Sequence, residues 1–280
     1  MRSTLPTSRR DDAVKPALAA FGRAVGIGLA GGVAAPAVMI GRSLFYAILL
    51  LVLSSFWDVA ARERLAGAAA HLPAAGLALY IGVTEWITLA TPAIHLRLED
   101  DIRSGALEAQ LLRPKSYLML RFGESFGAML VRLVAVAAVA LVLLAVSGRQ
   151  GPPAGVFPWL LLTGLLGAVA GLLVLTLVGL TAFWVRRTLP VYLVVQKASF
   201  LLGGLLAPVT LYPPWLRRLG ELSPFAAHLY WPAALTLDPS ARTLALALAS
   251  QLSWIAILTG LCLLVWRAGL AKILRQGFSA

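Results

Sequence analysis

Residues 125–147 have the sequence SFGAMLVRLVAVAAVALVLLAVS, in which Arg132 is the one charged side chain. About 20 apolar residues span the hydrocarbon core of a bilayer as a helix, because every backbone N–H and C=O is then satisfied within the segment. The segment Ser125–Ser147 is therefore expected to cross a membrane.

Five further windows have the same length and character. They are Val38–Trp57, Pro73–Ile94, Phe157–Val185, Pro190–Val209 and Thr243–Trp266. The chain shows no internal repeat and no long low-complexity linker. We therefore expect an all-α membrane protein with six transmembrane helices, divided into a tail over residues 1–32 and one transmembrane domain over residues 33–280.

The composition excludes several classes of protein. Of the 280 residues, 60% are apolar and 13% are charged, with a mean hydropathy of +0.85. A soluble domain carries about a quarter charged residues, so a soluble enzyme and a disordered tail are both excluded. The one cysteine, Cys262, lies in an apolar run and indicates a small buried hydrophobe rather than a disulfide scaffold.

The net charge is +12, and the distribution of the basic residues predicts the orientation. The basic residues cluster in short groups between the apolar runs, as they do in membrane proteins that follow the positive-inside rule. We therefore expect no nucleic-acid partner. Met1–Pro16 is polar and carries no secretory signal. With the N-terminus inside, the inner segments hold sixteen Lys and Arg residues and the outer loops hold six. Both termini are therefore expected in the cytoplasm.

The segment Ala13–Gly32 is apolar but rich in glycine, and it carries Lys15 and Arg23. We predict an amphipathic helix that lies in the inner headgroup layer and contacts membrane lipid. A seventh crossing is the alternative, and it would place the two termini on opposite sides.

The segment from Ile94 to Glu124 is the most charged part of the chain, with five basic and five acidic residues. The pair Ser104-Gly105 is expected to break the helix that continues the second span, and Pro114 disfavours helix at Arg113. Between them we predict a two-turn helix, about Ala106–Leu112, held between two elbows and suited to a groove on a partner. A solvated charged loop is the alternative.

The segment from Leu206 to Arg242 carries six prolines. Pro214 suits the first turn of a helix, after which Trp215, Leu216, Leu219 and Leu222 share one face. Two short helices that dip into the outer leaflet fit this pattern, and an ordinary loop with aromatic anchors fits nearly as well.

Three charges fall within the expected spans. Glu85 lies near the middle of the second span, where a carboxylate is usually paired or protonated. Arg42 and Arg132 lie about a turn inside the inner ends of spans one and three, close enough to snorkel to the headgroups. Glu85 either belongs to a translocation path or proton relay, or pairs with an arginine or with a hydroxyl such as that of Thr88.

The motifs of several enzymes are absent. No GxxxxGK[ST] phosphate loop is present, and HExxH and GxSxG are also missing. Glu99-Asp100-Asp101 is the single acidic cluster, whereas a magnesium-dependent lipid-linked transferase usually needs two. The three histidines are scattered. We therefore expect no catalytic residue, no metal site and no ATP hydrolysis by this chain itself.

Three runs resemble the ABC-2-type permeases, the membrane subunits of one class of ABC exporter. The first runs from Asp101 through Gly105 to Pro114, with Ala106 at a position where that family often has threonine. The second extends from Gly203 to Pro232. The third, Trp266-Arg267-Ala-Gly-Leu270, is similar to the ending of a subgroup often encoded as tandem permeases.

The resemblance implies a coupling helix seated on a cytoplasmic ABC ATPase dimer, beside a second permease that is identical or homologous. It implies ATPase-coupling residues at Glu99, Asp100, Asp101, Arg103, Gly105, Ala106, Leu107, Glu108, Leu111, Leu112, Arg113 and Pro114. It also implies an outer re-entrant gate with Pro208, Pro213, Pro214, Trp215, Pro224 and Phe225.

The expected function is therefore that of an exporter permease in a bacterial inner membrane, with ATP and Mg²⁺ bound by the separate ATPase and no cofactor in this chain. One alternative is an ion-gradient-driven secondary transporter or channel that depends on Glu85. A membrane-embedded assembly subunit without transport is the third possibility.

Overall fold

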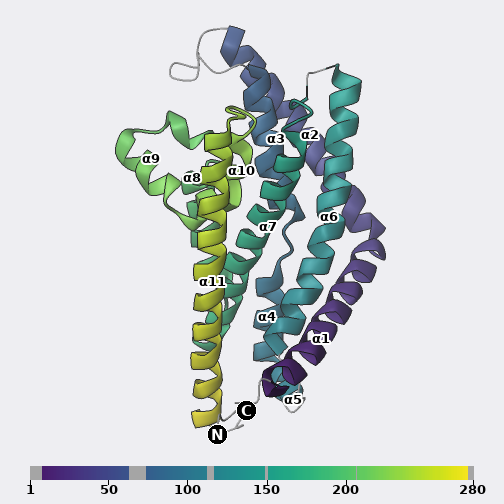
Figure 1. Cartoon of the computed structure of the whole chain (residues 1–280), viewed down its shortest axis with the longest axis vertical. Helices are drawn as coiled ribbons and strands as arrows, with labels where there is room; N and C mark the ends of the chain where they lie inside the picture. Colours follow the sequence, from purple (N-terminus) through teal and green to yellow (C-terminus); the bar gives the residue numbers. More distant parts are fainter. Residues whose placement is uncertain (1–7, 63–73, 112–116, 149–150, 206, 277–280) are drawn as a thin grey trace, which may run out of the picture.

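The structure, a computed structural model, describes residues 8–62, 74–111, 117–148, 151–205 and 207–276, and these contain helices and no strand (Figure 1). The long helices are α1 (Ser8–Val33), α2 (Pro36–Arg62), α3 (Ala74–Ala90), α6 (Tyr117–Ser147), α7 (Phe157–Leu180) and α11 (Ala241–Gln276). The shorter ones are α4 (Ile94–Arg103), α5 (Ala106–Leu111), η2 (Thr181–Phe183), α8 (Leu189–Leu202), η3 (Val209–Leu211), α9 (Pro214–Glu221), η4 (Ala226–Tyr230) and α10 (Trp231–Ala234).

Six helical stretches of the described chain are long and apolar enough to cross a membrane. Five of them coincide with spans expected from the sequence: Pro36–Phe56, Gly76–Arg103, Tyr117–Ser147, Phe157–Phe183 and Ala241–Arg275. The sixth is Pro16–Val33, within α1.

The expectation that Pro190–Val209 spans the membrane is wrong, because the helix in this segment is too short. Its helix, α8, has 14 residues, or about 21 Å at 1.5 Å per residue, which is short of the hydrocarbon core of about 30 Å. The helix stops because Gly204 adopts a φ of +66°, which a side chain would strongly disfavour. The Tyr80 hydroxyl then donates a 2.7 Å hydrogen bond to the Gly204 carbonyl and fixes the turn against α3.

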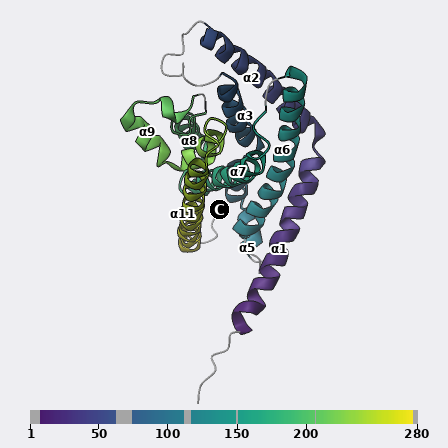
Figure 2. The same cartoon turned by 45° about the horizontal axis from the view of Figure 1, so that its top comes forward.

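The N-terminal helix was expected to lie in the headgroup layer, but it packs along the first half of α6 (Figure 2). Glycines allow this close approach: a Cβ on Gly28 would overlap the backbone of Glu124, and a Cβ on Gly127 would overlap that of Val25. Small residues four apart bring helices together in this way in membranes. Beyond Val33 the chain bends, and α2 continues toward the end of the bundle opposite α5, so α1 and α2 together pass along the bundle once rather than twice (Figure 1).

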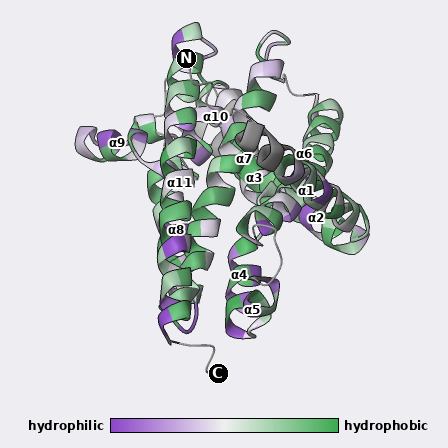
Figure 3. Ribbon diagram, turned by 60° about the horizontal axis from the view of Figure 1, so that its bottom comes forward, coloured by the Kyte–Doolittle hydropathy of each residue, from purple (hydrophilic) through white to green (hydrophobic). Residues whose placement is uncertain are grey.

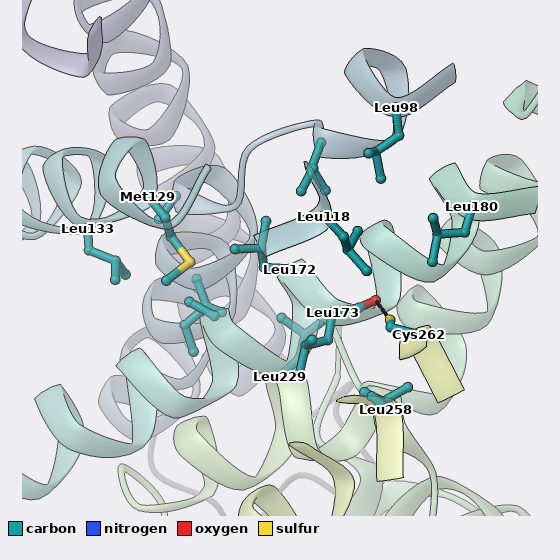
Figure 4. Packing of buried hydrophobic residues seen from close by; sticks show 14 of the residues in the cluster. Leu98, Leu118, Met129, Leu133, Leu172, Leu173, Leu180, Leu229, Leu258 and Cys262 are labelled. Atoms are coloured by element: carbon teal, nitrogen blue, oxygen red, sulfur yellow. Dashed lines mark hydrogen bonds between the residues drawn. The ribbon is translucent and has the colours of Figure 1, made fainter. Parts of the chain in front are cut away.

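The core lies around α7, which contacts α3, α4, α6, α8 and α11. Buried leucines from these helices interlock, and the Cys262 thiol of α11 lies 3.5 Å from the Leu173 carbonyl of α7 (Figure 4). The expectation that Cys262 is a small buried hydrophobe is confirmed, since it is 3% exposed.

The long helices consist mostly of hydrophobic residues, while hydrophilic residues are frequent on α4 and α5 (Figure 3). On α2, for example, Leu44, Ile48 and Val52 are each more than half exposed. A surface of this kind suits lipid rather than water.

Candidate functional site

The charged segment between α3 and α6 folds as two short helices, which we call the elbow (residues 94–111). Residues 91–93 separate it from α3, and Gly105 joins α4 to α5 with a φ of +75°. The break expected at Ser104-Gly105 and the short helix after it are both observed, with α5 running from Ala106 to Leu111. Leu98 and Leu107 are fully buried and hold the elbow against the bundle. Leu112, Arg113 and Pro114 lie outside the described residues.

Glu99 points into the protein. Its carboxylate accepts hydrogen bonds from the Thr188 backbone N–H (2.8 Å) and hydroxyl (2.5 Å), immediately before α8 begins. Arg103 and Arg187 lie 3.6 and 3.9 Å from the other carboxylate oxygen. Thr188 is fully buried, so Glu99 fixes the start of α8 to the elbow.

Asp101 is likewise engaged within the chain. It accepts a 2.5 Å hydrogen bond from the Tyr117 hydroxyl and pairs with Arg121 at 2.8 Å. Arg121 also pairs with Glu124 at 2.9 Å. These contacts join the elbow to the first two turns of α6.

An aromatic stack continues this connection to α7 and α11. Tyr117 stacks on Trp266 with ring centroids 5.5 Å apart, and Phe183 lies 5.8 Å from the same indole. Lys272 donates a 2.8 Å hydrogen bond to the Phe183 carbonyl. From the sequence, Trp266 is known only as the end of the last expected span and the start of the third resembling run, because no local pattern shows which aromatic residues meet in space.

The other expected coupling residues differ in exposure, and Leu107 is buried. Asp100 and Arg103 are exposed and Glu108 is half-buried. Asp100 makes no ion pair with any residue that the structure describes. The elbow thus has an inner side that binds the bundle, through Glu99 and Asp101, and a free side.

The proline-rich segment lies at the other end of the bundle from the elbow (Figure 1). Pro208 and Pro213 precede η3 and α9, and Pro214 opens α9 as expected. Trp215, Leu219 and Leu222 are exposed, which gives α9 an apolar outer face. On its polar face Arg217 hydrogen-bonds Glu221 at 2.7 Å, and this bond raises the pKa of Arg217 above its ordinary value.

After α9 the chain returns into the bundle. Pro224 and Phe225 lead into η4, which is buried against α7. Here His228 Nδ1 lies 2.9 Å from the Gly167 carbonyl, and a side chain at Gly171 would overlap the imidazole ring. Gln251 of α11 donates hydrogen bonds to the Thr163 and Ala227 carbonyls. Segment 207–240 is therefore built into the bundle rather than forming a peripheral loop.

The three charges of the spans do not pair with one another. Glu85 is 5% exposed and forms no ion pair within the described chain, and the Thr88 hydroxyl donates to the Thr84 carbonyl instead. The pairing that we expected for Glu85 is not formed. Arg42 donates a 2.6 Å hydrogen bond to the Leu89 carbonyl. Arg132 lies midway along α6 because α6 begins at Tyr117, so it is deeper than one turn from the helix end.

No cluster of His, Cys, Asp or Glu side chains suited to a metal ion occurs in the part of the chain that the structure describes.

Comparison with known families gives one match. Residues 76–277 match the family model described as ABC-2 family transporter protein. The matched stretch contains the elbow, the proline-rich segment and every helix from α4 to α10. No curated protein matches the chain.

Proposed function

The chain belongs to the ABC-2 transporter family, and from this premise we propose that it is the permease subunit of an ATP-binding-cassette exporter. The protein is a multi-pass membrane protein with six candidate spans. In the proposal, a separate ATPase binds ATP and Mg²⁺ and hydrolyses ATP, and this chain transmits the resulting motion to its own spans.

The two-sided elbow is the observation that carries this proposal. Asp100 on α4 and Glu108 on α5 form no ion pair with any described residue, and α5 is a short helix beside the bundle. Glu99 and Asp101 bind the starts of α8 and α6. The elbow is attached to several spans and carries charges that no described residue pairs. It is therefore suited to bind a partner and to transmit that partner's rigid-body motion to the spans.

The elbow is proposed to act as a lever. ATP binding closes the ATPase dimer and displaces α5 as a rigid body. The displacement passes through Asp101 and Tyr117 to α6, and through Glu99 and Thr188 to α8. From Tyr117 the stack with Trp266 and Phe183 extends the motion to α7 and α11.

The proposed assembly contains two ATPases and two permeases, the second permease being identical or homologous to this chain. It lies in a bacterial inner membrane with both termini in the cytoplasm, as the distribution of basic residues favours. Residues 207–240 then face the outside as re-entrant helices that gate the exit, and α1 begins on the cytoplasmic side. The ending at residues 266–270 favours the tandem-permease subgroup.

Charge reversal on the free side of the elbow tests the proposal. We expect Asp100→Arg combined with Glu108→Arg to abolish co-purification of the partner ABC ATPase. Arg218→Glu, an exposed reversal on α9, is the matched control and should leave the complex intact. Full assembly and transport by the elbow double variant would exclude the coupling role.

One observation favours a second candidate, a secondary transporter driven by an ion gradient. Glu85 is buried within the bundle without an ion pair among the described residues, as a proton-carrying carboxylate can be. This candidate requires Glu85→Gln to abolish transport and requires transport without any ATPase. Full activity of Glu85→Gln would exclude it.

A further inference from the structure

Arg42 of α2, Arg97 of α4 and Arg132 of α6 come from three helices, of which α2 and α4 both pack against α6. The positive charges of Arg42 and Arg97 both act on Arg132. Arg42 reaches the Leu89 carbonyl at the end of α3, and Arg97 lies one turn into α4, just beyond the break. Like charges in an apolar bundle repel each other and are costly to desolvate.

No acidic partner balances these arginines in the described chain. Arg42, Arg97 and Arg132 form no ion pair there, and Nη1 of Arg132 is buried without any hydrogen-bond partner. The acids of the neighbouring segments do not pair with these arginines: Glu99 binds Thr188, Asp101 and Glu124 bind Arg121, and Glu85 of α3 forms no ion pair with a described residue. A buried donor left without a partner costs free energy, and an anion bound between these half-buried and exposed arginines would supply the missing acceptor.

An apolar cavity of about 390 Å³ lies about one helical turn from Arg42 and Arg132 along their helices. It lies between α2, α3, α6 and α7 and is lined chiefly by aliphatic side chains, with Tyr46 and Trp86 among its walls. Tyr46 is one turn beyond Arg42, and Ala137, another wall residue, is just over one turn beyond Arg132. The volume lies in the range of ligand pockets, about 300–1,000 Å³.

We propose that Arg42, Arg97 and Arg132 bind the phosphate of an anionic phospholipid whose acyl chain enters this cavity. Arginine suits phosphate because its planar guanidinium donates two parallel hydrogen bonds. A phospholipid fits this site because its anionic phosphate can bind the arginines while its apolar acyl chain occupies the neighbouring cavity. We assign this lipid to the cytoplasmic leaflet, and that assignment rests on the topology in the proposed function. The binding site itself does not depend on the proposed function.

Lipid binding to the purified full-length chain tests the arginine cluster. Native mass spectrometry is used to count retained phosphatidylglycerol and phosphatidylcholine of identical acyl chains. We expect a preference for phosphatidylglycerol, lowered about tenfold or more by Arg132→Gln and by Arg42→Gln. Arg97→Gln alters an exposed residue, which folding tolerates, and should weaken binding as well. Arg23→Gln, an exposed arginine on α1, is the control and should change nothing.

Two variants of the cavity test the acyl-chain half of the site. Ala137→Phe and Ala140→Phe fill the cavity between α3 and α6. They should weaken binding of long-chain phosphatidylglycerol about tenfold and leave binding of its dihexanoyl form unchanged. Equal retention of both lipid classes by the unaltered chain would overturn the proposal, as would arginine variants that retain phosphatidylglycerol fully.

Failure of this site is distinguishable from failure of the exporter assignment. The arginine and cavity variants should all co-purify with the ATPase, whereas the elbow reversals should keep their lipid. In phosphatidylcholine alone, Arg132→Gln should melt no lower than the unaltered chain, because it removes a charge without a partner. A large drop in melting temperature would show that Arg132 is structural and would count against the site.

Discussion

The Glu99 carboxylate accepts both the backbone N–H and the hydroxyl of Thr188, 89 residues further along the chain. This pair attaches α4 to the residue before α8, at a place where both residues are buried. The acidic residues of the elbow therefore divide into two kinds. Those that face the bundle position helices, and those that face away are free for a partner.

The first prediction concerns this pair. Glu99→Leu removes both acceptors and leaves the buried Thr188 N–H unpaired, which should cost about 1–3 kcal/mol of folding free energy. Glu99→Gln keeps one acceptor oxygen and should cost less. Thermal unfolding of the purified chain in detergent measures the difference. Asp100→Asn, on the exposed side of the same helix, should shift the melting temperature little; an equal effect at both positions would contradict the division of the elbow.

A second prediction separates binding of the ATPase from transmission of its motion. Tyr117→Phe removes the hydroxyl that binds Asp101 but keeps the ring stacked on Trp266. The ATPase should still co-purify, while transport per ATP hydrolysed should fall by several-fold because α6 follows the elbow less closely. Arg218→Gln, at the other end of the molecule, is the control. Loss of ATPase binding in Tyr117→Phe would show that this contact belongs to the docking surface.

Much of the fold follows from local sequence. Hydropathy locates α2, α3, α6, α7 and α11, because a membrane helix satisfies its own backbone and therefore depends on composition alone. The break at Gly105 and the start of α9 at Pro214 are also local, since glycine and proline act on their own dihedral angles. The elbow was expected for the same reason.

Contacts between distant segments could not be predicted in the same way. The early end of α8 depends on Gly204 meeting Tyr80, and the partners of Glu99 and Asp101 depend on how α4 packs. The sequence does contain a signal for the position of α1, although a hydropathy profile does not show it. Gly28 and Gly32 are four residues apart, as are Gly123 and Gly127. This spacing of small residues indicates helix contact.

A third prediction tests the close approach of η4 to α7. A methyl group at Gly171 would overlap the His228 ring, so Gly171→Ala should displace η4 and cost about 1–3 kcal/mol, as overpacking does. Gly260→Ala in α11 is the matched control. Its added carbon meets nothing within 4 Å, so its effect should be within about 1 kcal/mol and stabilising. Chemical or thermal unfolding measures both, and equal stability of the two variants would show that His228 does not pack against Gly171.

The last prediction tests the position of α1. A Cβ on Gly123 would lie 3.0 Å from the Cβ of Ala24, close to the 3.5–4.5 Å that a disulfide requires. The double variant Ala24→Cys with Gly123→Cys should therefore form a disulfide on mild oxidation in membranes, measured as loss of two maleimide-reactive thiols. Cys262 is buried and should contribute little to labelling. Gly22→Cys with Gly123→Cys is the control, because Gly22 has open space around it. If both pairs stay reduced, α1 does not lie against α6, and the headgroup-layer position expected from the sequence would be favoured again.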